Sequence, residues 1–563
     1  MAGGYPVGST EFDRVLRRVS ALNNEFSTWE PHLQEIARYT MPRNGRFLNT
    51  DRNKGEKKHN QILDNTALKS ARILGAGLMS GATSPARPWF RLSVADRDLM
   101  RNDNVKLWLS ECAVRMLDVI GRSNTYRAFH TMYDEIGPFG TAANIVMDDF
   151  DKVIHHYPLT VGEYRLANNH KGEVDTLTRR FDKTVIDVVR QFGYNNCSTY
   201  VKNAFDRGNY DDWVTIVHVI EPRTERDMKA KDAANMPFKS CYFEEAAHQN
   251  KYLLNGGMRR FRALAPRWSL VSGDVYGHGP GMESLGDNKQ LQHQQLRKGQ
   301  AIDYQVNPPL NVPTEFKNRD VERFPGGINY VSDTSRGVRS AYEVQLNLQH
   351  LLADIEDCRE RIRQSYFTDI FMMLAMGSQT TMKTATEIAE RHEEKMVMLG
   401  PVLERLHNEM LAPFIDMLFE RMLQAELLPP PPEELMGVDL NVEFVSILAQ
   451  AQRAVNTAGI DRLVMNLGSI AGLKPEILDK FNADEYADIY SDMLGVDPRL
   501  IVPDAKVALI RKSRADAQMA QAQQMQAAQA AETAKTLASA NTGTQNALTD
   551  LTQAYQGYTI PQA

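Results

Sequence analysis

Two short clusters in this chain have residue types and spacing that could support catalysis or metal binding. Asp148, Asp149 and Asp151 form a carboxylate cluster, and hard divalent cations prefer clustered carboxylate oxygens. Such a cluster would suit a metal-dependent nuclease, but a solvated turn is the interpretation we favour for a short run of charges. His155 and His156 are adjacent in an extended segment, where neighbouring side chains point to opposite faces. We therefore do not expect the two imidazoles to share a metal ion.

Motifs of common enzymes are missing from the sequence. There is no GxxxxGK[ST] phosphate loop, no HExxH zinc motif, no GxSxG nucleophile turn and no GxGxxG dinucleotide motif. No CxxC pair occurs among the four cysteines, which we expect to be buried and reduced: Cys112, Cys197, Cys241 and Cys358. The sequence therefore predicts a protein that is not an enzyme, with no catalytic residues, no cofactor and no metal.

Composition restricts the remaining classes of protein. The 563 residues include 65 Lys and Arg against 71 Asp and Glu, a net charge of −6, which argues against a dedicated cationic DNA-wrapping protein. Hydrophobic residues make up 42% of the chain, as in ordinary globular proteins. The apolar run Phe371 to Met376 is far shorter than the roughly 20 residues that span a bilayer. The first residues do not resemble a signal peptide, so we expect no membrane partner.

The first half of the chain mixes helical and strand patterns. Residues 10–40 and 104–137 have apolar residues at helical spacing, and a helix is also expected from Gln61. The basic stretch 42–59 between the first two helices lacks periodicity and reads as a loop. Alternating segments follow between residues 140 and 222, and three of them predict strands: Val153–Leu159, Val174–Phe181 and Trp213–Ile220. This half is therefore predicted to be α+β.

The middle of the chain is dominated by helices. Ser284, with Asp287 three residues later, is expected to cap a helix that runs to about Val306 and is polar almost all round. Such a helix usually bridges solvent or packs against copies of itself. A second long helix is expected after Ser340, with one apolar stripe. A third is expected from Thr384 to about Leu428, kinked or divided at two internal prolines, Pro401 and Pro413.

The C-terminal part changes composition again. Residues 437–510 read as short helices joined by Gly and Pro turns. Ala and Gln dominate residues 511–540, which favours a helix with little apolar surface to bury. Residues 541–563 are expected to be a flexible tail.

This order of parts resembles that of portal proteins, the head-to-tail connectors of short-tailed bacteriophages of the podovirus type. The segment Gly77–Phe90 resembles the N-terminal signature of that family, and Val275–Gly281 resembles its entry to the first stem helix. Pro325–Tyr330 and Thr384–Ile388 are also similar to family segments. The signature residues are Gly77, Ser80, Gly81, Pro85, Arg87, Pro88 and Trp89.

The resemblance implies an α+β, mainly α-helical fold of the portal type, assembled as a ring with an axial channel. It divides the chain into parts as follows: wing 1–281, first stem helix 282–306, clip 307–337, second stem helix 338–374, tunnel loop 375–384, long kinked helix of the wing 385–428, crown 429–510, Ala/Gln-rich barrel helix 511–540 and flexible tail 541–563. It places Gln379, Thr380, Thr381 and Lys383 in the loop that faces DNA, and Lys317, Arg319 and Arg323 in the clip.

The implied role is structural. A ring of copies, usually twelve, occupies one capsid vertex, and double-stranded DNA is packaged and ejected through it. The implied partners are further copies of the chain, the terminase large subunit, major capsid and scaffolding proteins, and tail adaptor and internal core proteins. The implied location is the virion, after assembly in the host cytoplasm. A different head–tail adaptor or internal core protein remains an alternative, and a metal-dependent nuclease a less favoured one.

Overall fold

The computed structural model describes most of the chain between residues 10 and 539. The described residues are 10–47, 55, 61–96, 99–100, 102–230, 232–246, 252–314, 317, 320–322, 328, 330, 338–340, 349–376, 398–435, 440–445, 460, 463–470, 472, 474–494, 502 and 504–539. They belong to two compact units, Met1–Gly495 and Val496–Ala563, which are treated separately below.

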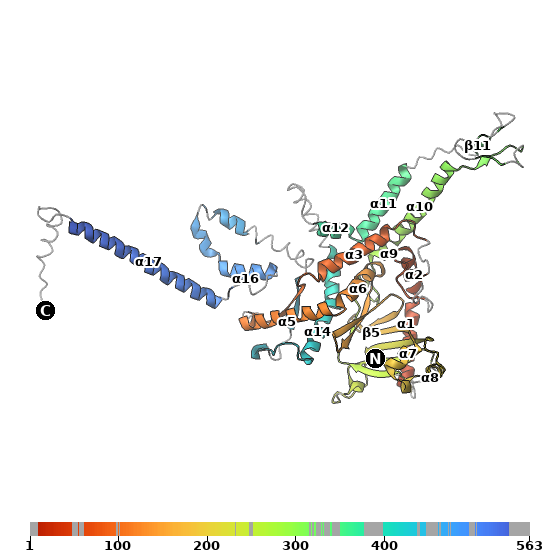
Figure 1. Ribbon diagram of the computed structural model, residues 1–563, viewed down its shortest axis with the longest axis horizontal. Helices are drawn as coiled ribbons and strands as arrows, with labels where there is room; N and C mark the ends of the chain where they lie inside the picture. The colour runs from red at the N-terminus through yellow and green to blue at the C-terminus, as the bar shows by residue number, and fades with distance from the viewer. Residues whose placement is uncertain are drawn as a thin grey trace. The chain divides into compact units, whose positions relative to one another are not determined.

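The first unit combines helices with four antiparallel sheets (Figure 1). The helices are α1 Glu11–Phe26, α2 Glu30–Tyr39, α3 Thr66–Ala82, α5 Asp103–Arg122, α6 Thr125–Phe139, α7 Val185–Phe192, α8 Thr199–Asp206, α9 Pro280–Glu283, α10 Leu285–Val306, α11 Gln349–Ser365, α12 Thr368–Met376, α14 Ala412–Gln424 and α16 Ala483–Leu494. The strands are β1 Phe90–Val94, β2 Ala143–Asp149, β3 Val153–Leu159, β4 Tyr164–Asn168, β5 Val174–Thr184, β6 Trp213–Pro222, β7 Phe238–Glu244, β8 Leu254–Met258, β9 Ala263–Leu264, β10 Leu310–Asn311, β11 Arg339–Ser340 and β12 Leu440–Phe444.

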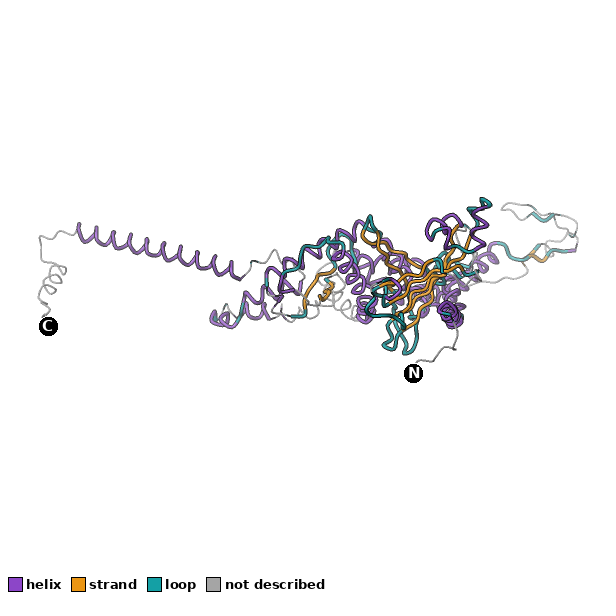
Figure 2. Tube along the Cα trace, turned by 90° about the horizontal axis from the view of Figure 1, so that it is seen from below, coloured by secondary structure: helices purple, strands orange, loops and turns teal. Residues whose placement is uncertain are grey.

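The largest sheet has the order β4-β5-β6-β7-β8, and helices cover both of its faces (Figure 2). Alternate residues of β6 point to opposite faces, so Val217 and Val219 pack with Phe12 of α1, whereas Val214 and Ile216 pack with α7 and α8. The three strands predicted between residues 153 and 220 are confirmed as β3, β5 and β6, and the α+β prediction for this half is confirmed with them.

A second core lies among α3, α5, α6, α11, α12 and α14. Small residues on α3 let its neighbours come close: a Cβ on Gly75 would lie 2.3 Å from Asp134 Oδ1, and one on Gly77 would lie 2.2 Å from the ring of Phe371. These two glycines of α3 therefore serve contacts with α6 and α12.

The polar helix predicted after residue 282 is present as α10, but its start differs from the prediction. Ser284 does not cap the helix through its side chain; its hydroxyl donates to Pro280 O at 2.7 Å. Asp287, which was expected to complete the cap, instead pairs with Arg361 at 3.1 Å. The short helix α9 directly precedes α10 and uses that serine to close its last turn.

The single helix predicted over 338–374 is interrupted. Arg339–Ser340 form β11, which pairs with β10, and the helical part is divided into α11 and α12 around Tyr366 and Phe367. Phe367 has a φ of 53°, a left-handed conformation that ends α11.

The predicted kink in the following long helix takes the form of a π-helical turn, His407–Leu411, between helical residues 398–406 and α14. Pro413, the second residue of α14, lacks the N–H that an uninterrupted α-helix would need there, so the wider turn accommodates it.

The second unit contains α17, Asp504–Ser539, which corresponds to the Ala/Gln-rich helix expected from composition. The side chains described between residues 508 and 536 are all exposed. In the described part of the chain, no helix has both the length and the apolar character needed to cross a bilayer.

Candidate functional site at the base of α10 and α11

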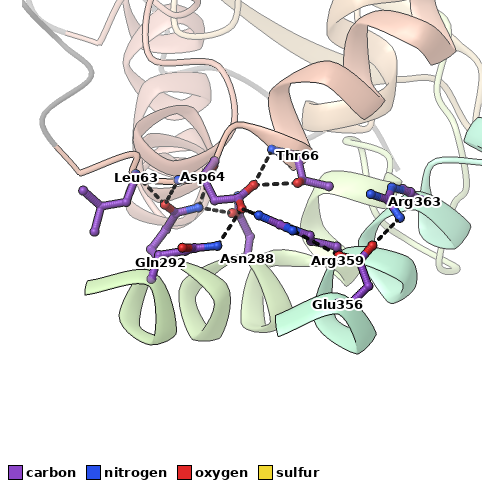
Figure 3. A network of polar contacts seen from close by, with 9 residues as sticks. Leu63, Asp64, Thr66, Asn288, Gln292, Glu356, Arg359 and Arg363 are labelled. Atoms are coloured by element: carbon purple, nitrogen blue, oxygen red, sulfur yellow. Dashed lines mark hydrogen bonds and ion pairs between the residues drawn. The ribbon is translucent and has the colours of Figure 1, made fainter. Parts of the chain in front are cut away.

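A buried carboxylate joins the helix pair α10–α11 to the N-terminus of α3 (Figure 3). One Asp64 oxygen accepts hydrogen bonds from the N–H and hydroxyl of Thr66, at 2.9 and 2.5 Å. The other accepts from Nε and Nη2 of Arg359 on α11, at 3.0 and 2.8 Å, and from Gln295 on α10 at 3.0 Å. Three helices therefore converge on one side chain.

Two amide side chains of α10 extend this contact. Gln292 Oε1 accepts from the backbone N–H groups of Leu63 and Asp64 at 2.7 and 2.8 Å, and its Nε2 donates to Asp64 O and to Asn288 Oδ1, both at 2.9 Å. Asn288 in turn donates to Tyr39 O at 3.0 Å. We call Asp64, Asn288, Gln292, Gln295 and Arg359 the polar junction. Its amides fix α10 against backbone groups that would otherwise be buried without partners.

The electrostatics of the polar junction favour a charged pair. Burial alone would raise the pKa of Asp64, but the hydrogen bonds from Thr66 and Arg359 outweigh burial, and the pKa is lowered. The same contact, together with one from Glu356, raises the pKa of Arg359. The pair is therefore ionised over the physiological range and can hold α11 rigidly to α3.

The far half of α10 has a different character. Beyond Gln295, four large apolar side chains are exposed: Leu296 at 47%, Ile302 at 40%, Tyr304 at 62% and Val306 at 79%. At 100° per residue, Ile302 and Tyr304 lie about 200° apart around the helix axis. Apolar groups on more than one side of a helix indicate contacts on more than one side.

The signature segment lies in the second core. Gly77, Ser80 and Gly81 are on α3, and Trp89 is fully buried, stacked against Phe444 at 6.4 Å between centroids. Between them the structure places the other three signature residues on the surface: Pro85, Arg87 and Pro88. This segment is thus an exposed loop held between two buried anchors.

The glycines of Val275–Gly281 serve a close contact with the end of α6. A Cβ added to Gly277, Gly279 or Gly281 would lie 2.4, 2.4 or 2.3 Å, respectively, from a backbone oxygen. The partner oxygens belong to Gly140, Gly137 and Pro138. This loop therefore sets the direction in which α9 and α10 leave the body, which is a positioning role.

The carboxylates and imidazoles that could have bound a metal have other contacts. Asp148 pairs with Arg262 at 2.7 Å and with Arg421 at 3.5 Å, and Asp149 accepts from the N–H of Asp151 at 2.8 Å. The predicted turn is therefore right only for Asp151, because Asp148 and Asp149 are the last residues of β2 and pair with β3. In the part of the chain that is described, no group of three or more His, Cys, Asp or Glu side chains is arranged to hold a metal ion.

His155 and His156 lie on opposite faces of β3, as the extended segment predicts. His155 contacts Tyr157, whereas His156 is buried between Thr125 and Asn144, at 3.0 and 2.6 Å. Burial lowers the pKa of His156 to about 3, so its ring is neutral.

Most of the residues expected to face DNA or to form the clip cannot be placed. Gln379, Thr380, Thr381 and Lys383 fall outside the described residues, as do Arg319 and Arg323. Lys317 is described: it is exposed in a turn, and its N–H donates to Thr314 O at 3.1 Å.

Sequence reasoning did not identify the polar junction. Asn288, Gln292 and Gln295 are spaced i, i+4 and i+7, which places them on one helix face and was the available signal. Nothing in the sequence connected that face with Asp64, which lies more than 220 residues earlier and meets Gln292 only in the fold.

Comparisons with known proteins cover almost the whole chain. A family model described as "Bacteriophage head to tail connecting protein" matches residues 13–502. The chain is 55% identical over 552 residues to a protein of Bordetella phage BPP-1 named "Probable portal protein", covering 98% of this chain and 99% of that protein. It is 42% identical to the "Portal protein" of Salmonella phage epsilon15, covering 97% and 99%. Among solved structures, a chain from the neck of an empty GTA particle aligns with a TM-score of 0.33 at 10% identity, over 77% of this chain and 90% of that one.

Proposed function

Because this chain belongs to the family of bacteriophage head to tail connecting proteins, we propose that it is a portal protein. Copies of the chain, twelve in the expected ring, surround an axial channel at one capsid vertex. Double-stranded DNA enters through the channel during packaging and leaves through it during ejection. The names of the two near-full-length relatives support this role, and both relatives are named as structural parts of a phage rather than as enzymes.

The observation that carries the ring proposal is the contrast within α10. Its first half is held to the same chain by the polar junction, whereas its far half exposes apolar side chains on more than one side. In a ring, each stem helix has a neighbouring copy on either side, and those copies would cover these groups. In this proposal the stem consists of residues 282–306, which include α10, and 338–374, which include α11 and most of α12, and residues 307–337 are the clip.

The net charge of the chain is compatible with a channel through which DNA slides. Each Lys or Arg that neutralises a DNA phosphate strengthens a salt-dependent attraction that would hold DNA in place. A chain with a net charge of −6, repeated around a ring, suits a conduit through which DNA slides. In this proposal Gln379, Thr380, Thr381 and Lys383 face DNA at the narrowest part of the channel, and Lys317, Arg319 and Arg323 belong to the clip.

The remaining partners follow from the place of a portal in the particle. The clip would receive the terminase large subunit and later the tail adaptor. The wing would meet major capsid and scaffolding proteins, and the C-terminal helix α17 would extend toward internal core proteins. Assembly would take place in the host cytoplasm, and the finished ring would stay in the virion.

The stem assignment is tested by placing a charge on the exposed apolar surface. We expect Ile302→Asp to prevent ring formation, measured by sedimentation velocity and negative-stain electron microscopy. Gln305→Asp adds the same charge at an exposed polar position of the same helix and should leave rings intact. Rings of normal size from Ile302→Asp would show that the far half of α10 is not a contact between copies.

A further inference from the structure

The short helix α12 is joined to α11 by residues whose conformation is costly. Phe367 has a φ of 53°, where the Cβ of a bulky residue crowds the backbone. This is the position after a helix end where glycine is normally found. Among the residues that the structure describes, two others that are not glycine have positive φ, Val153 and Glu426, and neither lines the cavity described next.

A cavity of about 610 Å³ lies beside this connection. It opens to solvent, and its walls come from residues 62–65 and from α3, α11 and α12, including Asp64, Arg363, Thr368 and Met372. An open space of this size next to a short helix leaves room for that helix to shift.

The first residue of α12 adds a second unfavourable feature. Thr368 is only 3% exposed, and its hydroxyl has no hydrogen-bond partner. A buried hydroxyl without a partner is costly, and this one lies next to the strained Phe367. The left-handed residue, the unpartnered hydroxyl and the cavity therefore meet at one point of the chain.

We propose that Phe367 is a pivot about which α12 takes two positions: the one described here, and one shifted into the cavity between α3 and α11. The described position is held by Phe371 against Gly77 and by Phe367 against Trp268, with ring centroids 6.1 Å apart. In the shifted position Phe367 relaxes to a right-handed conformation. Strain of this kind persists where the surroundings enforce it, and it is common in segments that switch. The proposal is independent of the function proposed above, since it concerns a movement within one chain.

Distances between spin labels test the pivot directly. Cysteines introduced at Ala353 of α11 and Met372 of α12 carry the labels, and both positions are exposed. The four native cysteines are buried and should stay unlabelled. Labelled full-length chains are assembled with a large excess of unlabelled chains, so that only pairs within one chain contribute. We expect two distances for this pair, and one distance for the control pair Ala353 and Ala76, which does not cross the pivot.

A matched pair of substitutions isolates the backbone strain. Phe367→Gly and Phe367→Ala remove the same ring, but only alanine keeps the cost of a left-handed φ. The ratio of chains with α12 in the described position to chains with α12 in the shifted position should therefore be about fivefold to thirtyfold higher in the glycine variant than in the alanine variant. A single distance that is the same in the wild-type chain and in both variants would overturn the proposal. Two distances in the control pair would also overturn it, because the movement would then lie elsewhere.

Discussion

The two ends of α3 are held in opposite ways. At its N-terminus, the polar junction binds α10 and α11 through a buried carboxylate with a cationic partner, Arg359. Farther along, Gly75 lets α6 come close at Asp134, and Gly77 lets α12 come close at Phe371. A second buried carboxyl, Glu135 on α6, accepts hydrogen bonds only from neutral groups among its described contacts. The first end of α3 is therefore held by charge and hydrogen bonds, whereas the contact at Gly77 depends on the volume of the side chains.

The same contrast appears in the acid–base behaviour of the two carboxyls. Glu135 accepts hydrogen bonds from Thr160 at 2.5 Å, from the N–H of Val161 at 3.2 Å and from Asn44 at 3.3 Å. Burial nevertheless raises its pKa to about 8. Asp64 is also buried, yet its pKa is lowered, because Thr66 and Arg359 outweigh burial. Glu135 is the more deeply buried of the two, and its donors are neutral, so burial outweighs them, whereas the donors of Asp64 include the Arg359 guanidinium.

The largest expected effect comes from removing the cation of the polar junction. Arg359→Met should lower the free energy of unfolding by about 3 kcal/mol, because Asp64 would remain buried without its charged partner. Urea denaturation measures this change. Adding Asp64→Asn to that variant should recover most of the loss. If Arg359→Met costs no more than Arg363→Met, whose partners Glu356 and Glu360 are exposed, the junction does not depend on its charge pair.

The next effect concerns the packing of α3 on α12. Gly77→Ala should cost about 2 kcal/mol, because the added methyl would overlap the ring of Phe371, which is only 4% exposed. Gly286→Ala in α10 meets nothing within 4 Å and should instead stabilise by about 0.5–1 kcal/mol. Thermal unfolding of the two variants compares them, and equal midpoints would contradict the distinction between the two regions.

The pH dependence of stability separates the two carboxyls. Folded Glu135 keeps a proton that the unfolded chain, with a pKa of 4.5, has released. Its favourable contribution is therefore complete below about pH 4.5 and is lost as pH rises through about 8. Glu163 lies nearby, and burial raises its pKa as well, so it acts in the same direction. Asp64 has the opposite sign, and its contribution is lost only in acid.

We therefore expect the free energy of unfolding to fall between pH 6 and pH 8, by about 1–2 kcal/mol from Glu135. Glu135→Gln should flatten this slope, and Asp64→Asn should leave it unchanged. Urea denaturation across this range measures the slope. A slope of the same steepness in Glu135→Gln would assign the titration to another group.

The smallest effect is expected from the C-terminal helix. Truncation after Val502 removes α17, whose described side chains between 508 and 536 are exposed and bury nothing. The free energy of unfolding of the first unit should change by less than about 0.5 kcal/mol. Rings should still form. Retention of DNA or attachment of internal core proteins should change. A truncated chain that fails to oligomerise would show that this helix belongs to the assembly interface.

The parts of the fold that depend on local patterns could be predicted from sequence. Strands such as Val174–Phe181 could be identified from their local sequence, and the polar α10 and the Ala/Gln-rich α17 are apparent from composition. Local signals failed where a residue that matches a cap makes another contact, either in the preceding turn or with a distant helix. Ser284 matches a capping residue, but its hydroxyl bonds to Pro280 O, and Asp287 is attracted to Arg361 on another helix. The break at Phe367 was also missed, because an aromatic residue gives no turn signal.

The candidate site could be predicted only in part. The polar face of α10 is visible as the spacing of Asn288, Gln292 and Gln295, but its partner Asp64 lies in a loop before α3. No spacing rule connects residues that far apart. The resemblance to portal proteins identified the family from short motifs. In the two motifs that lie within the described residues, glycines allow close contacts between elements: Gly77 with Phe371 of α12, and the glycines after Val275 with the end of α6.

We propose that copies of this chain form a ring around a channel, with α10 and α11 in its stem. Negative-stain electron microscopy of the purified full-length protein, with two-dimensional averaging, tests this proposal most directly. We expect end-on views of a ring with an open centre wide enough for duplex DNA, and loss of those views in Ile302→Asp but not in Gln305→Asp. Single chains, or assemblies without a central opening, would contradict it.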